Sequence, residues 1–311
     1  MRAAVIVPLT VVVLAAAAAG VWAVTALGSA GGPECRVPGD PTAAAGSVPD
    51  VELTAAQLQN ASTIAAVGLS RGLPERAVVI ALATAYQESS LRNRPDGDRD
   101  SVGLFQQRPS QGWGTAAEII DPVYSAGRFY DALVEVEDWD TGALTVVAQA
   151  VQYSGFPEAY AQWEPQATTL ARQFTGAAPL GPSCRDDAAA PTAAVPDRPV
   201  VPGAEAAGTA AADLLADAAA ERGPLTVLEV SADGRTVTVS ADVPVGVDPG
   251  GVTAGASDTA TATARSLAAW AVAHAVGAPV VEVVAAGQGW TDAEWSDRPG
   301  PDVPAVRLTV G

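Results

Sequence analysis

The feature that most constrains this chain is an uncharged apolar run from Ala3 to Leu27, near the start of its 311 residues. About 20 consecutive apolar residues are enough for a helix to cross the hydrocarbon core of a bilayer. The apolar part of a cleaved signal peptide is shorter, roughly 7 to 15 residues. We therefore expect residues 1–29 to form a transmembrane anchor, with signal cleavage and secretion as the alternative.

The charges around this run predict its orientation. Arg2 precedes the run, and the next basic residue is Arg36. Because positive charge is retained on the cytoplasmic side, we expect the N-terminus in the cytoplasm and the bulk of the chain outside it. A single spanning segment cannot enclose a pore, which argues against a channel or transporter. The expected protein is a single-pass protein of the cell membrane that contacts the bilayer through residues 3–27.

Charge and side-chain chemistry exclude further classes of function. The formal net charge is -18, from 35 acidic and 17 basic residues. This balance opposes nucleic-acid binding, which depends on Lys and Arg neutralising phosphates. With one His, two Cys and one Met, the chain lacks the ligands for a usual zinc site or for carriage of softer metals. We expect neither a metal nor a cofactor.

The two cysteines, Cys35 and Cys184, both lie in the part of the chain that is expected to be exported. Compartments outside the cytoplasm are oxidising, so we expect a disulfide between them, with two free thiols as the alternative. In the chain-entropy model, closing so long a loop stabilises the folded state by on the order of 5 kcal/mol.

Two segments without hydrophobic periodicity divide the remaining chain. Residues 30–50 and 177–203 are rich in Pro, Ala and Gly and are predicted to be linkers. Residues 51–176 between them have a helical pattern almost throughout. The string TAAQ at 54–57 has capping-box spacing, and Pro74 suits the first turn of the next helix. Further helices are expected around residues 116–120, 123–135, 142–151 and 160–174.

Residues 204–311 follow a different pattern. An alanine-rich helix precedes two strands, LTVLEVS and RTVTVSA, which are joined by Asp233-Gly234, a strong hairpin signal. A second helix near 257–276 and two more strands, PVVEVVAA and VPAVRLTV, complete the order α-β-β-α-β-β. This order predicts a small α+β domain with helices on one face of a mostly antiparallel sheet. The predicted fold is multidomain: a membrane helix, an all-α domain and a small α+β domain.

Glu88 is the strongest catalytic candidate. It lies near the C-terminal end of a largely apolar helix, where the helix dipole disfavours negative charge and should raise its pKa. Such a carboxyl stays protonated and can act as a general acid, and cleavage of a glycosidic bond begins with protonation of the leaving oxygen. Without further motifs, a solvated carboxylate near a helix end would be the ordinary interpretation.

Two motifs favour the catalytic interpretation of Glu88. The string QESSLRN is followed by a short acidic loop and by GLFQQRPSQGWG. This pair resembles the goose-type lysozyme and soluble lytic transglycosylase superfamily, in which a helix ending in Glu-Ser faces a Gly-Leu-Met-Gln segment. Gly103 to Gln106 match the second motif, with Phe105 in place of Met. With DPVYSAGRFYDAL and AQAVQYSGFPEAYAQW, residues 51–176 look like lysozyme-like domains of exported proteins from high-GC Gram-positive bacteria.

The resemblance implies a lysozyme-like fold and cleavage of peptidoglycan glycan strands at the MurNAc–GlcNAc bond. Glu88 would be the acid, and Ser89 and Gln106 would orient it or the sugar. Tyr153, with Gln152, would stand in place of the family's Ala-Tyr-Asn signature, although the string here is AVQYSG. The residues expected to bind the substrate are Ser89, Gln106, Gln107, Trp113 and Tyr153.

A second carboxylate decides between hydrolysis and transglycosylation. An inverting hydrolase needs one roughly 6.5 to 9.5 Å away to activate water, and Asp98 is the nearest equivalent of the goose-type enzymes' base. The aspartate that those enzymes carry after the Gly-Leu-Met-Gln motif is absent, since Gln107 and Arg108 stand there. A lytic transglycosylase uses one Glu alone, and the sugar's own hydroxyl closes an anhydro ring. We favour this chemistry, and Asp98 is catalytic only in the hydrolytic alternative.

The loop between the two motifs carries alternating aspartates, Asp96, Asp98 and Asp100, a pattern that also occurs in calcium loops. The EF-hand requires a glycine at its sixth position and a glutamate at its twelfth, where this chain has Ser101 and Gln107. The sequence therefore predicts no metal in this loop.

Two functions stay open on the sequence. The first is an anchored enzyme that cleaves glycan strands close to the membrane. The second is a catalytically degenerate lysozyme-like domain that binds peptidoglycan or acts as a scaffold, while the C-terminal domain docks on an envelope protein partner. The C-terminal domain carries no recognisable site, and its single histidine, His274, is expected to be a packed or partly exposed residue rather than a catalyst.

Overall fold

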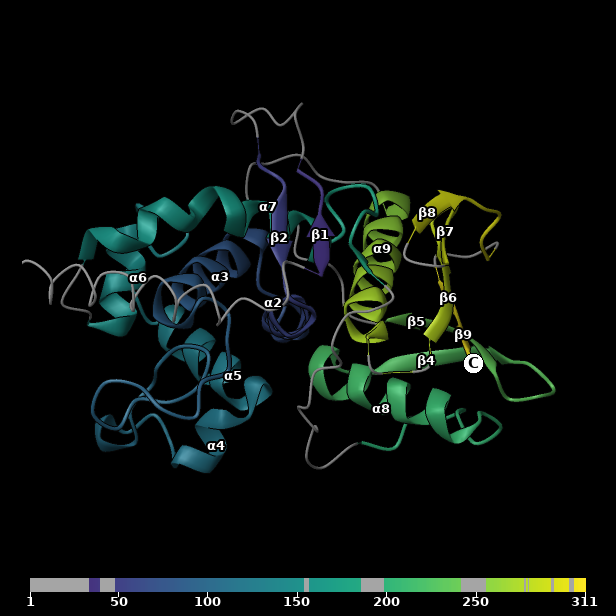
Figure 1. The fold of residues 1–311 in the computed structure, drawn as a ribbon, viewed down its shortest axis with the longest axis horizontal. Helices are drawn as coiled ribbons and strands as arrows, with labels where there is room; N and C mark the ends of the chain where they lie inside the picture. The colour runs from purple at the N-terminus through teal and green to yellow at the C-terminus, as the bar shows by residue number, and fades with distance from the viewer. Residues whose placement is uncertain are drawn as a thin grey trace, which may run out of the picture. The chain divides into compact units, whose positions relative to one another are not determined.

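The computed structural model describes residues 34–39, 48–153, 157–185, 199–241, 256–276, 278, 280–291, 294–301 and 305–311 (Figure 1). The membrane anchor expected at residues 1–29 lies outside these ranges. Within them, no helix combines the length and the apolar character needed to cross a bilayer. Residues 34–311 form one compact unit of helices and two antiparallel sheets.

A small antiparallel sheet joins segments that are far apart in the sequence. Its strands are β1 (Cys35–Val37), β2 (Val51–Leu53) and β3 (Ser183–Cys184), in the order β2-β1-β3. Cys35 pairs with Cys184 across the sheet and is joined to it by the predicted disulfide, which is thus confirmed. This sheet corrects the expectation of an all-α domain, and β1 and β3 fall in segments predicted to be linkers. Strands of two or three residues beside Gly and Pro carry too little alternation to be recognised.

Helix α2 (Ala55–Ser70) begins with the predicted capping box. The amide of Gln57 donates to Thr54 Oγ1 at 3.3 Å, and the amide of Thr54 donates to Gln57 Oε1 at 2.9 Å. These two bonds satisfy amides that the first turn of a helix leaves without partners. The start of α2 is therefore fixed by its own side chains.

Helix α3 (Glu75–Ser89) follows Pro74, which is its N-cap residue, and every residue from Ala77 to Tyr86 is buried. The helices that follow in the chain are α4 (Ala116–Ile120), α5 (Pro122–Leu133), α6 (Leu144–Gln152) and α7 (Glu164–Phe174), with the 3-10 helices η1 (Pro109–Gln111) and η2 (Pro157–Trp163). These bounds lie close to the predicted helices. α3 contacts α2, α5, α6, α7 and η2, so it is the central helix of this region.

The C-terminal part begins with α8 (Thr209–Arg222) and contains a six-stranded antiparallel sheet in the order β4-β5-β9-β6-β7-β8. Its other elements are β4 (Leu225–Val230), β5 (Thr236–Ala241), α9 (Ala256–Ala275), β6 (Val280–Ala285), β7 (Gln288–Thr291), β8 (Glu294–Asp297) and β9 (Val306–Val310). The predicted order α-β-β-α-β-β is present, and the Asp233-Gly234 turn joins β4 to β5 as expected. The prediction omitted β7 and β8, which are short and largely polar.

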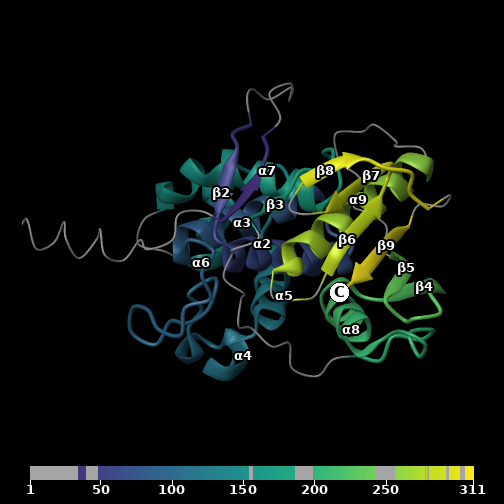
Figure 2. The same cartoon turned by 45° about the vertical axis from the view of Figure 1, so that its right-hand side comes forward.

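One face of the large sheet is buried. In β9 the buried residues Val306, Leu308 and Val310 alternate with the half-exposed Arg307 and Thr309. Helices α8 and α9 both contact β5 and β9, and Figures 1 and 2 show them beside the sheet. Both helices also contact α2, and α9 contacts α7. The helical region therefore packs against α8 and α9 of the C-terminal part. That residues 177–203 separate two domains stays a prediction.

A buried polar cluster joins α8 to α9. Trp270 Nε1 donates to Glu221 Oε2 at 2.6 Å, and His274 Nε2 lies 3.3 Å from Glu221 Oε1. The Trp270 and His274 rings are stacked, with centroids 4.0 Å apart. Glu221 and His274 are 3% and 6% exposed, so His274 is a packing residue as expected. A carboxylate this deeply buried is tolerated because both of its oxygens have partners.

We expect the Cys35→Ser/Cys184→Ser double variant to lose about 2 to 5 kcal/mol of unfolding free energy, because the disulfide restricts a long loop in the unfolded chain. Urea unfolding followed by tryptophan fluorescence measures this loss. Reduction of the wild-type protein should move the unfolding midpoint in the same direction. An unchanged midpoint in both cases would show that the small sheet holds the two segments without the covalent bond.

We expect Glu221→Ala to lower the unfolding free energy by about 3 kcal/mol, because it leaves the buried indole N–H of Trp270 without its acceptor and the ring of His274 without its partner on α8. The matched control is Glu229→Ala, which removes an exposed glutamate of β4 and should cost less than about 0.5 kcal/mol. The same urea titration compares the two. Equal effects of both substitutions would contradict a structural role for the α8–α9 cluster.

Candidate active site

Glu88 lies one residue before the end of α3, where the buried helix reaches the surface, and its side chain is half-buried. The hydroxyl of Tyr160 donates a hydrogen bond of 2.6 Å to Glu88 Oε1. Tyr160 belongs to η2 and is fully buried, so the core fixes the position of its ring. The carboxyl is therefore held from one side by a rigid neutral donor.

Burial raises the pKa of Glu88, and hydrogen bonds from Tyr160 and Gln152 act in the opposite direction without cancelling the rise. The sequence predicted this direction from the helix dipole, whereas the larger physical cause is desolvation of the carboxylate. Gln152, at the end of α6, also donates to the carbonyl of Phe105 at 2.7 Å. It thus links the candidate acid to the Gly103–Gln107 segment.

Ser89 fastens this segment to α3. Its hydroxyl lies 2.7 Å from the carbonyl of Leu104, to which it donates, and its side chain is 5% exposed. Gly103 lies at φ 82, and a Cβ there would come within 2.7 Å of the carbonyl of Ile119. Glycine is therefore required at this position, where two backbones approach closely. Ser89 therefore positions the Gly103–Gln107 segment beside Glu88. Among the described hydrogen bonds, none joins the Ser89 hydroxyl to the Glu88 carboxyl.

Gln106 and Gln107, at the end of the Gly103–Gln107 segment, both form hydrogen bonds within the protein. Gln106 donates to the carbonyl of Gly103 at 3.2 Å, and its side chain fills the space where a Cβ of Gly97 would lie. Gln107 is 2% exposed and donates to the carbonyl of Ser125 at 3.2 Å. Both side chains therefore brace the loop and α5. Their predicted roles in binding a sugar stay predictions.

Two of the three aspartates in the acidic loop, Asp98 and Asp100, differ in their surroundings. Hydrogen bonds from Ser110 and Arg108 hold the pKa of Asp100 well below its usual range, with Arg108 Nε 2.7 Å from Asp100 Oδ1. The side chain of Asp98 is 93% exposed, and its nearest ion-pair partner is Arg99 at 3.9 Å. Within the described ranges, no group of three or more His, Cys, Asp and Glu residues is placed to hold a metal.

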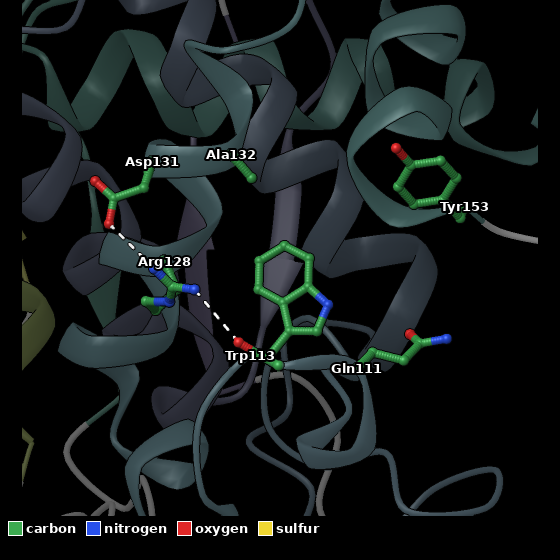
Figure 3. Close-up of a pocket in the computed structure, with 7 residues that line it drawn as sticks. Gln111, Trp113, Arg128, Asp131, Ala132 and Tyr153 are labelled. Carbon is green, nitrogen blue, oxygen red and sulfur yellow. Dashed lines mark hydrogen bonds and ion pairs between the residues drawn. The ribbon is translucent and has the colours of Figure 1, made fainter.

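A cavity of about 650 Å³ brings together Trp113 and Tyr153, two residues that the sequence singled out separately (Figure 3). Tyr153, the C-cap residue that follows α6, is 87% exposed. Glu88 does not line this cavity. Gln152 connects Glu88 to the cavity, because it precedes Tyr153 in the chain and donates a hydrogen bond to Glu88. The complete lining is Gln111, Gly112, Trp113, Arg128, Asp131, Ala132 and Tyr153.

The aromatic residues that neighbour Glu88 in the last turns of α3 and in η2 pack on one another. Tyr86 stacks on Trp163 with ring centroids 5.1 Å apart, and it is 7% exposed. Trp163 Nε1 donates to Gln87 Oε1 at 2.9 Å. These contacts fix the last turn of α3 against η2, the element that also carries Tyr160.

Sequence reasoning did not identify Tyr160 as a site residue. It lies 72 positions after Glu88, and no local pattern connects the two. The only available signal was its place in AQAVQYSGFPEAYAQW, the stretch that carries part of the family resemblance. The resulting arrangement is a single carboxyl with a raised pKa and two neutral hydrogen-bond donors, which suits general acid catalysis.

We expect Tyr160→Phe to raise the pKa of Glu88 further, because it removes a hydrogen bond that favours the charged carboxylate. A pH titration of the carboxyl carbon by NMR, on protein with labelled glutamate, measures this pKa without requiring activity. Tyr124→Phe is the matched control, since the Tyr124 hydroxyl donates to the carbonyl of Trp113 instead. A lower or unchanged pKa of Glu88 in Tyr160→Phe would contradict the assigned hydrogen bond.

Comparison with known proteins gives no family for this chain. No family model matches it, and no curated protein matches it. The likeness to goose-type lysozymes and lytic transglycosylases therefore rests on the motif residues themselves, chiefly Glu88-Ser89 and Gly103–Gln106.

Proposed function

We propose that this protein is a peptidoglycan-cleaving glycosidase, a lytic transglycosylase that acts on the MurNAc–GlcNAc bond with Glu88 as its single general acid and base. The observation that carries the proposal is the environment of Glu88. Its carboxyl has a raised pKa, receives a hydrogen bond from the buried Tyr160, and lies at the end of a helix joined by Ser89 to the Gly103–Gln107 segment.

The proposed reaction begins with the protonated carboxyl of Glu88, which donates its proton to the glycosidic oxygen as the C1–O4 bond breaks. The C6 hydroxyl of the muramyl residue then forms a bond to C1 and gives its proton to the Glu88 carboxylate. The products are an anhydro sugar and a free C4 hydroxyl, and Glu88 is again protonated. Tyr160 and Gln152 would stabilise the carboxylate between the two steps, since both donate to it.

The loop aspartates support one-carboxylate chemistry over hydrolysis. Asp100 is held by Arg108 and Ser110, and the side chain of Asp98 extends into solvent. A hydrolytic base must be oriented towards a water beside the sugar. Asp98 fills that role only if the loop rearranges when a glycan binds, and it remains the candidate base of the hydrolytic alternative.

We propose that the protein works outside the cytoplasm, held at the cell membrane by residues 3–27, with secretion after signal cleavage as the alternative. The Cys35–Cys184 disulfide supports an oxidising compartment. A second candidate function is a degenerate, peptidoglycan-binding scaffold whose C-terminal part docks on an envelope protein. The tyrosine of the family's signature is displaced in this chain, and Tyr153, the residue proposed in its place, is exposed; this favours that candidate.

The decisive experiment is digestion of purified peptidoglycan by the full-length protein, with released muropeptides identified by mass spectrometry. We expect anhydro products from the wild type and at least a 100-fold slower release from Glu88→Gln, because the general acid is lost. Glu158→Gln, which changes an exposed glutamate of η2, is the matched control and should retain activity. Circular dichroism checks that all three proteins are folded.

Other products would lead to other conclusions. Reducing-end products that require both Glu88 and Asp98 would establish a hydrolase and overturn the transglycosylase proposal. A folded wild-type protein that releases nothing, but cosediments with peptidoglycan, would favour the scaffold.

A further inference from the structure

The cavity beside Trp113 is lined by one arginine, Arg128, and by two aromatic side chains, Trp113 and Tyr153. It lies between the loop that follows η1, the helix α5 and the end of α6. Figure 3 shows the indole of Trp113 between Arg128 on one side and Tyr153 on the other. The volume of about 650 Å³ is within the range of pockets that bind small molecules. The cavity is therefore large enough to hold a small ligand.

The cavity lining contains one basic and one acidic residue, Arg128 and Asp131. Asp131 Oδ1 is bound by Arg71 Nη1 at 2.5 Å, and Arg71 lies outside the lining. Arg128 Nη1 lies 3.9 Å from Asp131 Oδ2, which is too far for a hydrogen bond. Asp131 is therefore engaged mainly by Arg71, and the guanidinium of Arg128 is left without a close carboxylate partner.

The guanidinium of Arg128 has unused donors. Its Nη2 makes a long hydrogen bond of 3.4 Å to the carbonyl of Gly112. Its Nε is buried and has no hydrogen-bond partner in the part of the chain that the structure describes. A guanidinium offers five N–H donors, and a buried donor without a partner is costly. The Arg128 side chain is 42% exposed, so a carboxylate ligand would reach its two Nη groups rather than the buried Nε, in the end-on bidentate geometry that an arginine fork allows.

The backbone on either side of Trp113 has a specific conformation. The glycines on either side of it have positive φ angles, 81° for Gly112 and 135° for Gly114, and the hydroxyl of Tyr124 donates to its carbonyl at 3.2 Å. The indole and the exposed ring of Tyr153 present flat apolar faces to the same cavity. Sugar rings pack on such faces through their C–H groups, so the aromatic pair and the arginine together fit a charged saccharide.

We propose that this cavity binds a saccharide that carries a carboxylate, with Arg128 pairing the carboxylate and Trp113 and Tyr153 packing on the sugar ring. This inference rests on the proposed function and names the part of the substrate that the cavity recognises. A muramyl residue carries a carboxyl on its lactyl ether, and a stem peptide carries carboxylates of its own. A glycan built only of GlcNAc has neither.

Binding is measured with the full-length Glu88→Gln protein, in which cleavage is expected to be at least 100-fold slower, by titration followed by tryptophan fluorescence at low salt. The probes are a neutral GlcNAc tetramer, a GlcNAc–MurNAc tetramer with free lactyl carboxylates, and the same tetramer with stem peptides. We expect at least one carboxylate probe to bind about 10-fold more tightly than the neutral tetramer, equivalent to about 1.4 kcal/mol. The probe that binds more tightly identifies the lactyl group or the stem peptide as the source of the carboxylate.

Arg128→Gln should abolish this preference and change the affinity of the neutral tetramer by less than about twofold. Arg128→Lys keeps the charge but loses the planar fork, so it should retain only part of the preference. The matched control is Arg36→Gln, on β1 and paired with Asp50, which should retain it fully. Circular dichroism confirms that each variant is folded.

Two results would overturn the proposal: equal affinities for the neutral and carboxylate probes, or an equal loss of affinity for all probes in Arg128→Gln. The assay does not depend on cleavage. A retained, Arg128-dependent preference in a protein that releases no muropeptides would leave the cavity in place and remove only the proposed activity.

Discussion

The burial of α3 is the constraint on which the rest of the candidate site depends. Every residue from Ala77 to Tyr86 is buried, and most are small enough for neighbouring helices to approach from several sides. Thr84, the polar exception, returns its hydroxyl to the carbonyl of Ile80 at 2.7 Å. Glu88 is placed where this helix leaves the core, so its carboxyl is desolvated on one side and reachable on the other.

This position sets a balance between two physical effects on one carboxyl. Burial favours the neutral acid, which can donate a proton, while Tyr160 and Gln152 favour the carboxylate that forms after donation. Both donors come from elements packed on α3, namely η2 and α6. The protonation behaviour of Glu88 is therefore a property of helix packing, and core substitutions between these elements should alter it without touching the carboxyl.

Local signals predicted the parts of the fold that are local in sequence. The capping box at Thr54, the helix that carries Glu88 and the Asp233-Gly234 hairpin each depend on residues a few positions apart. The hydrogen bond from Tyr160 to Glu88 and the cavity shared by Trp113 and Tyr153 depend on tertiary packing, which no spacing encodes. Strands as short as β1 or β8 gain their stability from their partners, so their own residues give little indication of them.

The small sheet determines where external force would enter the fold if residues 3–27 anchor the chain as proposed. β1 is the first described strand after that segment, and it lies between β2, which leads into α2, and β3, to which the disulfide joins it. A pull on β1 would therefore be shared by two antiparallel neighbours, one covalent bond and α7, which β1 contacts directly. α7 in turn contacts α3, so α7 is the element that connects the small sheet to the helix that carries Glu88.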